Sequence, residues 1–246
     1  VQMKYLLKNI LSKLNYQLSK INSNYIHYPL EQTNEGILIK FLESKSVSLV
    51  LDVGANVGQW ANEIRDSGYK QKIISFEPLS SAFSVLSSNC SDDSFWTSQN
   101  VAVGDSNAIS EINISKNSVS SSLLPMLDSH INAAPDSLFH GREEIQIMKL
   151  DSIPKESLST DDIVFLKIDT QGYEKKVLDG AKILLDQTVG IQLEMSFDAL
   201  YEGEMNFSEL KGFLEDLGFY LFHIQNGFRH STSQELMQVD TIFIRK

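Results

Sequence analysis

The sequence predicts an α/β protein in which a mostly parallel sheet carries helices on both faces. Three observations predict this fold. From about residue 47, short apolar runs rich in β-branched residues alternate with stretches of helical periodicity. Glycines stand where several of these runs turn into helices. Near the C-terminus, two apolar runs follow each other without a helix between them, which predicts an antiparallel hairpin at one edge of the sheet.

The first elements are the most regular. Val47–Val53 is an apolar run that ends at a glycine, as a buried parallel strand does. A helix is expected over Gly58–Ser67, closed by Gly68. The next strand is expected at Lys72–Phe76 and the next helix at Ser80–Asn89. These elements form two consecutive strand–helix units.

The middle of the chain is less regular. We expect the third strand at Asn100–Val103 and a further short strand at Ala108–Ile114. Residues 115–142 are rich in Ser and Asn and contain Pro125 and Pro135. Long irregular stretches in compact domains often serve as lids, so this segment is the expected lid.

Regular alternation returns after residue 145. Ile163–Ile168 is a strong buried strand, and Gly180 interrupts the helical stretch that follows it. The remaining strands are expected at Ile145–Leu150, Val189–Met195, Phe219–Ile224 and Val239–Ile244, and the remaining helices at Tyr173–Leu185 and Phe207–Leu217.

Composition excludes several classes of protein. A chain of 246 residues that is 42% hydrophobic has enough apolar side chains for one large core and is too apolar for a disordered chain. No apolar run approaches the roughly 20 residues of a membrane-spanning helix. The net charge of −11 disfavours a nucleic-acid partner. The single cysteine, Cys90, excludes an intrachain disulfide and fits a reducing compartment, so we expect a cytoplasmic protein.

Residues 1–30 differ from the remainder in charge because they contain four lysines and no acid. Apolar residues recur at helical spacing from Leu7 to Ile21, which predicts a basic amphipathic helix. The chain thus divides into an N-terminal helix region, 1–30, and one domain, 31–246. Two interpretations stay open. The helix packs on its own domain or on a second copy in a homodimer, which is the commoner use, or residues 1–22 lie on an anionic membrane surface or on a partner.

The most informative motif is LDVGANVGQW at residues 51–60, where the first strong strand turns into a helix. Open α/β sheets bind ligands at such a turn. Gly54 permits a sharp turn, and Gly58 opens a helix whose free N–H groups favour an anion. The spacing D-x-G-x-x-x-G differs from the G-x-G-x-x-G of pyrophosphate binders. A carboxylate at Asp52 would repel a pyrophosphate but suits an ammonium beside a carboxylate, as in the methionine moiety of S-adenosylmethionine.

A second acid strengthens this interpretation. Glu77 stands at the carboxyl end of the second strand, where an acid can accept hydrogen bonds from both hydroxyls of an adenosine ribose. Taken alone, Glu77 is better interpreted as an acid at a helix N-terminus. An acid at this position and a glycine-rich turn could together also bind NAD. The spacing of the glycines and the presence of Asp52 favour the sulfonium cofactor instead.

Two further acids end later strands. Asp169 follows Ile163–Ile168, and Glu194 ends the next strand, so the two carboxylates are expected to share a site. Asp169 is a candidate general base, an orienting group for a substrate hydroxyl, a ligand of the cofactor's ammonium or, with Glu194, a ligand of a divalent cation such as Mg²⁺. Alternatively, Glu194 pairs with a cation such as Lys167. His140, at the end of the irregular segment, is a rival base, although a lone loop histidine is more often solvated.

These motifs resemble the FkbM family of S-adenosylmethionine-dependent methyltransferases. The resemblance covers about residues 45–245, and the block FLKIDTQGYEKKVLDGA is its most specific part. It implies a class I methyltransferase fold with a seven-stranded sheet, and O-methylation of a hydroxyl on a sugar, a glycan or a related natural product. The matching blocks are LDVGANVGQW (51–60), SFEP (75–78), NVAVGD (100–105), SVSSSLL (118–124), MKLDSIP (148–154), FLKIDTQGYEKKVLDGA (165–181), IQLEMSF (191–197) and LGFYLF (217–222).

The resemblance also implies roles for single residues. Glu77 would bind the ribose, Ala102 would lie beside the adenine through its backbone, and Ser121 in the serine cluster would lie at the cofactor. Asp169 and Glu194 would stand at the ends of the fourth and fifth strands. The methionine end would be held by Asp52, Gly54, Ala55, Asn56 and Gly58. Two other functions stay open: a non-catalytic domain that binds the cofactor or a partner, and an NAD-dependent oxidoreductase.

Overall fold

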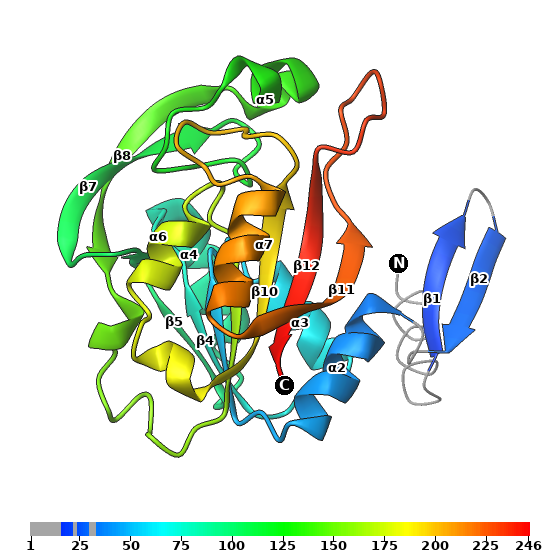
Figure 1. Cartoon of the computed structure of the whole chain (residues 1–246), viewed down its shortest axis with the longest axis vertical. Coiled ribbons are helices and arrows are strands. Elements are labelled where there is room, and N and C mark those ends of the chain that lie inside the picture. The colour runs from blue at the N-terminus through cyan, green and yellow to red at the C-terminus, as the bar shows by residue number, and fades with distance from the viewer. Residues whose placement is uncertain (1–15, 22–23, 30–32) are drawn as a thin grey trace.

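The computed structural model describes residues 16–21, 24–29 and 33–246. Its centre is a seven-stranded sheet with helices on both faces (Figure 1), as expected. Strand β12 runs antiparallel to both of its neighbours, and the other pairs are parallel, so the expected edge hairpin is confirmed. Across the sheet, the strands are β11 (Phe219–Asn226), β12 (Gln238–Arg245), β10 (Thr188–Ser196), β9 (Val164–Ile168), β3 (Leu49–Val53), β4 (Lys72–Phe76) and β5 (Trp96–Gln99).

The two central strands explain the strongest sequence signals. Every residue of β3 and of β9 is buried, because helices cover both faces of the sheet there. From β3 the chain proceeds outward to β4 and β5, and it then returns to β9 on the other side of β3. The carboxyl ends of β3 and β9 therefore flank the point where the strand order reverses, which is the usual ligand site of open α/β sheets.

One face of the sheet is covered by α2 (Asn34–Ser44), α3 (Gln59–Asp66) and α4 (Ser80–Cys90). Leu42, Ile64 and Leu86 of these helices belong to one buried cluster with Val50 and Phe165 of the central strands. Helix α2 was not expected from the sequence. The residue that could have indicated its start is Thr33, whose hydroxyl accepts a hydrogen bond from the Gly36 amide at 3.1 Å and caps the helix.

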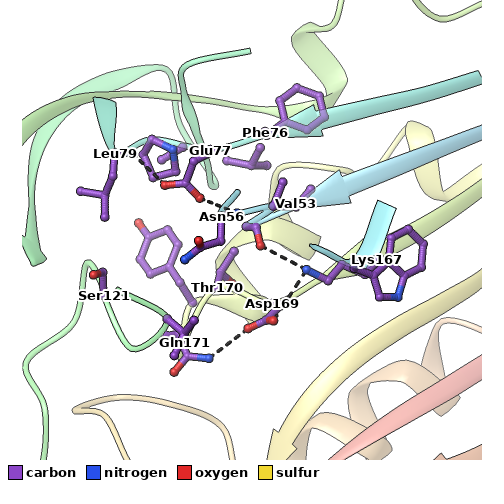
Figure 2. A pocket seen from close by; sticks show the side chains of 18 of the residues that line it. Val53, Asn56, Phe76, Glu77, Leu79, Ser121, Lys167, Asp169, Thr170 and Gln171 are labelled. Carbon is purple, nitrogen blue, oxygen red and sulfur yellow. Dashed lines mark hydrogen bonds and ion pairs between the residues drawn. The ribbon is translucent and has the colours of Figure 1, made fainter. Parts of the chain in front are cut away.

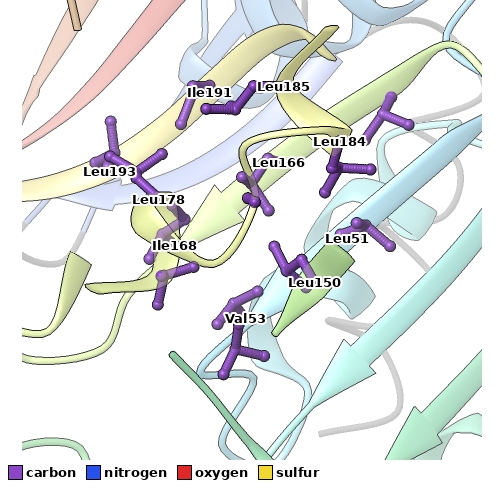
Figure 3. Packing of buried hydrophobic residues seen from close by; sticks show 14 of the residues in the cluster. Leu51, Val53, Leu150, Leu166, Ile168, Leu178, Leu184, Leu185, Ile191 and Leu193 are labelled. Carbon is purple, nitrogen blue, oxygen red and sulfur yellow. The ribbon is translucent and has the colours of Figure 1, made fainter. Parts of the chain in front are cut away.

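The opposite face is covered by α6 (Glu174–Asp179) and α7 (Phe207–Asp216). Leu178 and Leu214 of these helices pack in the larger buried cluster of the protein. Figure 3 shows Leu51, Leu166 and Leu193 of three adjacent strands in this cluster. Alternate residues of the central strands thus pack against the helices on opposite faces of the sheet. This packing fixes the positions of the strand ends relative to one another.

A smaller sheet lies beside the main one, with the strand order β6 (Ala102–Val103), β8 (Phe139–Met148), β7 (Ala108–Ser115). The strand expected at Asn100–Val103 is present as β6, but it is shorter than expected and belongs to this smaller sheet. In the main sheet, the strand beside β4 is β5, which was not expected and in which the Trp96 indole is buried and donates to the Ser75 hydroxyl at 2.9 Å. The segment expected to be irregular contains α5 (Asp128–Ala133), and its last residues belong to β8.

The helix predicted in the N-terminal region is wrong for residues 16–21, which the structure describes as a strand. Residues Tyr16–Ile21 form β1, which pairs antiparallel with β2 (Asn24–Pro29). Aromatic and β-branched residues in this stretch favour strands and outweigh the helical spacing of the leucines. The remainder of the expected helix, residues 1–15, lies outside the described residues. In the described part of the chain, no helix has the length and apolar character needed to cross a bilayer.

Candidate active site

A cavity of about 290 Å³ lies at the carboxyl ends of the strands, where the strand order reverses. Figure 2 shows side chains from β3, β4 and β9 and from the serine-rich segment around it. The cavity has the size of a small-molecule site. Of the predicted residues, Gly54, Ala55, Asn56, Glu77, Ala102, Ser121 and Asp169 line it, whereas Asp52, Gly58, Glu194 and His140 do not.

The turn after β3 lies directly against the end of β9. Gly54 has φ +74, and a Cβ at this position would lie 1.8 Å from the Asp169 carbonyl oxygen. The next residues turn sharply as well, with φ 49 at Asn56 and φ 87 at Gly58. Gly58 is the N-cap of α3 and packs against Trp96, so its function is to let the helix start close to the sheet. Because the two strand ends lie this close together, only glycine fits at position 54.

Glu77 is held rigidly at the cavity wall. Its Oε2 accepts a hydrogen bond from the Asn56 amide and its Oε1 one from the Leu79 amide, each at 2.8 Å (Figure 2). Burial raises the pKa of Glu77 to about 7, although both hydrogen bonds act to lower it. The carboxylate retains lone pairs that can accept from hydroxyl groups in the cavity. Apolar side chains continue the wall beyond it: Leu79, Val101, Ala102, Val103 and Ile112.

Asp52 is fully buried beneath the turn and does not reach the cavity. Its Oδ2 accepts from the Ser75 hydroxyl at 2.9 Å, and its Oδ1 lies 3.3 Å from the Lys167 ammonium. The expectation of direct contact with a ligand's ammonium therefore does not fit this placement. The side chain points to the face of the sheet that α3 covers, beside Lys167, its neighbour in register on β9.

Lys167 is the principal residue that sequence reasoning missed. Its side chain is only 7% exposed, yet it lines the cavity, where the ammonium lies 3.6 Å from Asp169 and donates to the Gly54 carbonyl at 3.1 Å. Burial acts to lower the pKa of Lys167, but the charges of Asp52 and Asp169 outweigh it and raise the pKa above its ordinary value. The signal was available, because residues two apart on a strand point to the same face and Lys167 precedes Asp169 by two.

Asp169 lies at the junction of these groups, and its side chain is 41% exposed. Its Oδ1 accepts from the Gln171 amide nitrogen at 2.9 Å, and that same nitrogen donates to Glu194 Oε2 at 2.7 Å. Glu194 also accepts from Gln238 at 3.1 Å. Burial and the charges of neighbouring acids, first among them Asp169, raise the pKa of Glu194 well above its usual value. The expected carboxylate pair is thus joined through an amide, and the alternative pairing of Glu194 with Lys167 is not formed.

This arrangement does not fit the expected divalent cation. The amide nitrogen of Gln171 donates to both carboxylates, so it occupies the position between them that a shared cation would need. Within the described ranges there is also no group of three or more His, Cys, Asp or Glu side chains that could hold a metal ion. We therefore assign no metal to Asp169 and Glu194.

Three hydrogen bonds hold the serine-rich segment over the cavity. The Asn56 side-chain amide donates to the Ser118 carbonyl at 3.2 Å, and the Ser122 hydroxyl donates to the Gln171 carbonyl at 2.7 Å. The buried Tyr201 hydroxyl contacts the Ser120 carbonyl at 3.1 Å. Ser118, Val119 and Ser121 line the cavity. His140, by contrast, is exposed on β8 away from the cavity, so its placement gives no support to a role as base.

Comparison with known proteins places this site in a family. Residues 52–221 match the family described as the methyltransferase FkbM domain. No curated protein matches the chain. One similar solved structure is the methyltransferase FkbM from Methylobacillus flagellatus, with 12% identity and a TM-score of 0.48 over 79% of this chain and 43% of that chain.

Two further structures are similar to a comparable degree. TehB from Haemophilus influenzae has 10% identity and a TM-score of 0.46 over 86% of this chain and 62% of that one. Magnesium protoporphyrin IX methyltransferase from Synechocystis PCC 6803, with bound SAM, has 11% identity and a TM-score of 0.45 over 86% of this chain and 78% of that one. The chain thus spans less than two thirds of the length of the first two. The family match covers well over half of the chain and includes both the glycine turn and the Lys167–Asp169 strand. The chain belongs to the FkbM methyltransferase domain family and has its Rossmann-like fold.

Proposed function

We propose that the protein is an S-adenosylmethionine-dependent O-methyltransferase that acts on a hydroxyl of a sugar, a glycan or a related natural product. The observation that supports this most is Glu77, a buried carboxylate that two backbone amides hold against the cavity beside an apolar stretch of its wall. A ribose with two hydroxyls on this carboxylate and an adenine against the apolar wall would fill that half of the cavity. The family match supports methyl transfer as the reaction.

The residues present fit the cofactor at its other end as well. The Gly54 carbonyl is an acceptor for an ammonium, and Lys167 is the one cation among the described residues that line the cavity. When bound, the cofactor supplies a methyl group on a positively charged sulfur. The chain supplies alignment, because Glu77 and Gly54 are fixed on neighbouring strand ends and the serine-rich segment covers them from solvent.

An alcohol is a weak nucleophile at neutral pH, so a base at the site speeds its attack. Asp169 is the carboxylate at the junction of the cavity, and we assign it this role. It would take the proton of the acceptor hydroxyl while the acceptor oxygen forms its bond to the methyl carbon and the bond from that carbon to sulfur breaks. Lys167 lies beside the other side of the carboxylate and would keep it oriented toward the acceptor.

Binding and turnover test separate parts of this proposal. Calorimetry should show that S-adenosylhomocysteine binds and that NAD does not, because the turn lacks the pyrophosphate spacing. Failure of S-adenosylhomocysteine to bind would overturn the proposal.

Transfer of a labelled methyl group to cell extracts then distinguishes an enzyme from a non-catalytic cofactor-binding domain. Asp169→Asn should reduce this transfer by about 100-fold or more, as loss of a general base does. Mass spectrometry of glycans from a deletion strain should show the loss of one methyl group from the acceptor.

A further inference from the structure

The cavity is longer than the cofactor half alone, and its residues follow the strand order of the sheet. Beyond Asp169, which follows β9, the lining continues with Gln192 on β10, Asp240 on β12 and Gln225 on β11. Trp60 of α3 covers this part from the side. We call the part of the cavity formed by Trp60, Gln192, Gln225 and Asp240 the distal arm.

Sheet register makes the distal arm polar. Gln192 lies beside Lys167 in the parallel pair of β10 and β9, and Asp240 lies opposite Gln225 in the antiparallel pair of β12 and β11. The Trp60 indole donates to Gln192 Oε1 at 3.3 Å, and the Gln225 amide donates to Asp240 Oδ2 at 3.3 Å. Each of these bonds fixes the orientation of a side chain at the wall of the arm.

Two polar atoms of the arm remain available. Gln192 is 8% exposed, and its amide nitrogen has no hydrogen-bond partner among the residues that the structure describes. Asp240 Oδ1 likewise accepts no hydrogen bond within those residues. Neither atom is fully buried, so both are open to the cavity. A ligand hydroxyl can therefore hydrogen-bond to either of them without displacing a protein contact.

We propose that the distal arm is the acceptor site and that it binds an uncharged ring with adjacent hydroxyl groups, such as a pyranose. This inference rests on the proposed function. One hydroxyl would accept from Gln192 and its neighbour would donate to Asp240, since a hydroxyl does both. The indole of Trp60 offers an apolar surface for the C–H face of the ring. Asp240 and the nearby Asp169 outnumber Lys167, the one cation among the described residues that line the cavity, so a phosphorylated acceptor with its further negative charge is disfavoured.

The fluorescence of Trp60 can report on binding at this site. It has two tryptophans, of which Trp96 is buried on β5 and Trp60 lines the distal arm. In a Trp96→Phe protein saturated with S-adenosylhomocysteine, the fluorescence therefore comes from Trp60. We would titrate it with neutral monosaccharides and with their phosphates. At least one neutral sugar should give a saturable change in the millimolar range, and its phosphate should bind more weakly.

Substitutions assign the effect to the arm. Gln192→Leu and Asp240→Asn should each weaken sugar binding by about tenfold, the size of one hydrogen bond to a buried or charged group. Both should leave the affinity for S-adenosylhomocysteine within about twofold of the starting protein. The matched control is Gln146→Leu, because Gln146 is exposed on β8 outside the cavity.

Two results would overturn the acceptor site while leaving the cofactor site intact. One is the absence of a saturable change with every sugar of the panel in protein that binds S-adenosylhomocysteine normally. The other is an equal loss of both affinities in Gln192→Leu, which would assign the arm to the cofactor. Absence of S-adenosylhomocysteine binding in the unsubstituted protein would instead refute the proposed function.

Discussion

Replacing Lys167 by methionine should be among the most destabilising single changes in the protein. The substitution retains the length of the side chain and removes the ammonium that lies 3.3 Å from Asp52. Asp52 is 0% exposed and has the Ser75 hydroxyl as its other partner. Removing one member of a buried ion pair costs about 3–5 kcal/mol, because the remaining charge is buried without compensation.

Urea unfolding followed by circular dichroism, with linear extrapolation to water, measures the change. The matched control is Lys211→Met, because Lys211 pairs with Glu215 on α7 where the two side chains are 35% and 39% exposed. The control should lose less than about 1 kcal/mol. The double variant Asp52→Asn with Lys167→Met should regain more than half of the loss. A change of under about 1 kcal/mol at pH 7 in Lys167→Met, or a double variant as unstable as the sum of its singles, would refute the reasoning.

Three further changes test the cofactor half of the site. Because the pKa of Glu77 lies at about 7 and a ribose needs the ionised carboxylate, affinity for S-adenosylhomocysteine should fall as the pH decreases through 7. Calorimetry should show weaker and pH-independent binding for Glu77→Gln. Gly54→Ala should abolish binding in the same assay, since its Cβ would lie 1.8 Å from the Asp169 carbonyl oxygen, and normal affinity would disprove that close approach. Tyr201→Phe removes the contacts to the Ser120 carbonyl and Gln171, and should accelerate amide hydrogen exchange over residues 118–122 without unfolding the protein; unchanged exchange would show that Tyr201 does not hold the lid.

Sequence reasoning located the strands that helices bury on both faces. Lys72–Phe76 was expected with the observed bounds, because a short apolar run between two turns is typical of a strand buried on both faces. It failed at β5, where Trp96–Gln99 is mostly polar and only the indole is buried. A short edge strand carries no such run, so its position depends on pairing with β4 instead of on its own composition.

The residues of the distal arm could not be predicted from the sequence, because a β-bulge determines which side chain lies opposite Asp240. The register of β11 against β12 shifts between Leu221 and His223, which leaves an extra residue on β11 and brings Gln225 opposite Asp240. In an unbulged hairpin, Ile224 would take that place, and the arm would have an apolar side chain where the structure has an amide. Period-two alternation in the sequence cannot reveal such a shift. It also cannot show that Asp240, rather than Glu194, is the carboxylate that lines the cavity beyond Asp169.

The two halves of the cavity rest on one buried row of polar side chains. Ser75, Asp52, Lys167 and Gln192 are neighbours in register on four adjacent strands, and all of them are buried. Such a row costs stability relative to an apolar core, so its position beneath the turn calls for a functional reason. Lys167 contacts the Gly54 carbonyl and Asp169 on the cofactor side, while Gln192 reaches Trp60 on the acceptor side. The row therefore fixes the relative position of the groups that would hold cofactor and acceptor, which is the alignment that an in-line methyl transfer needs.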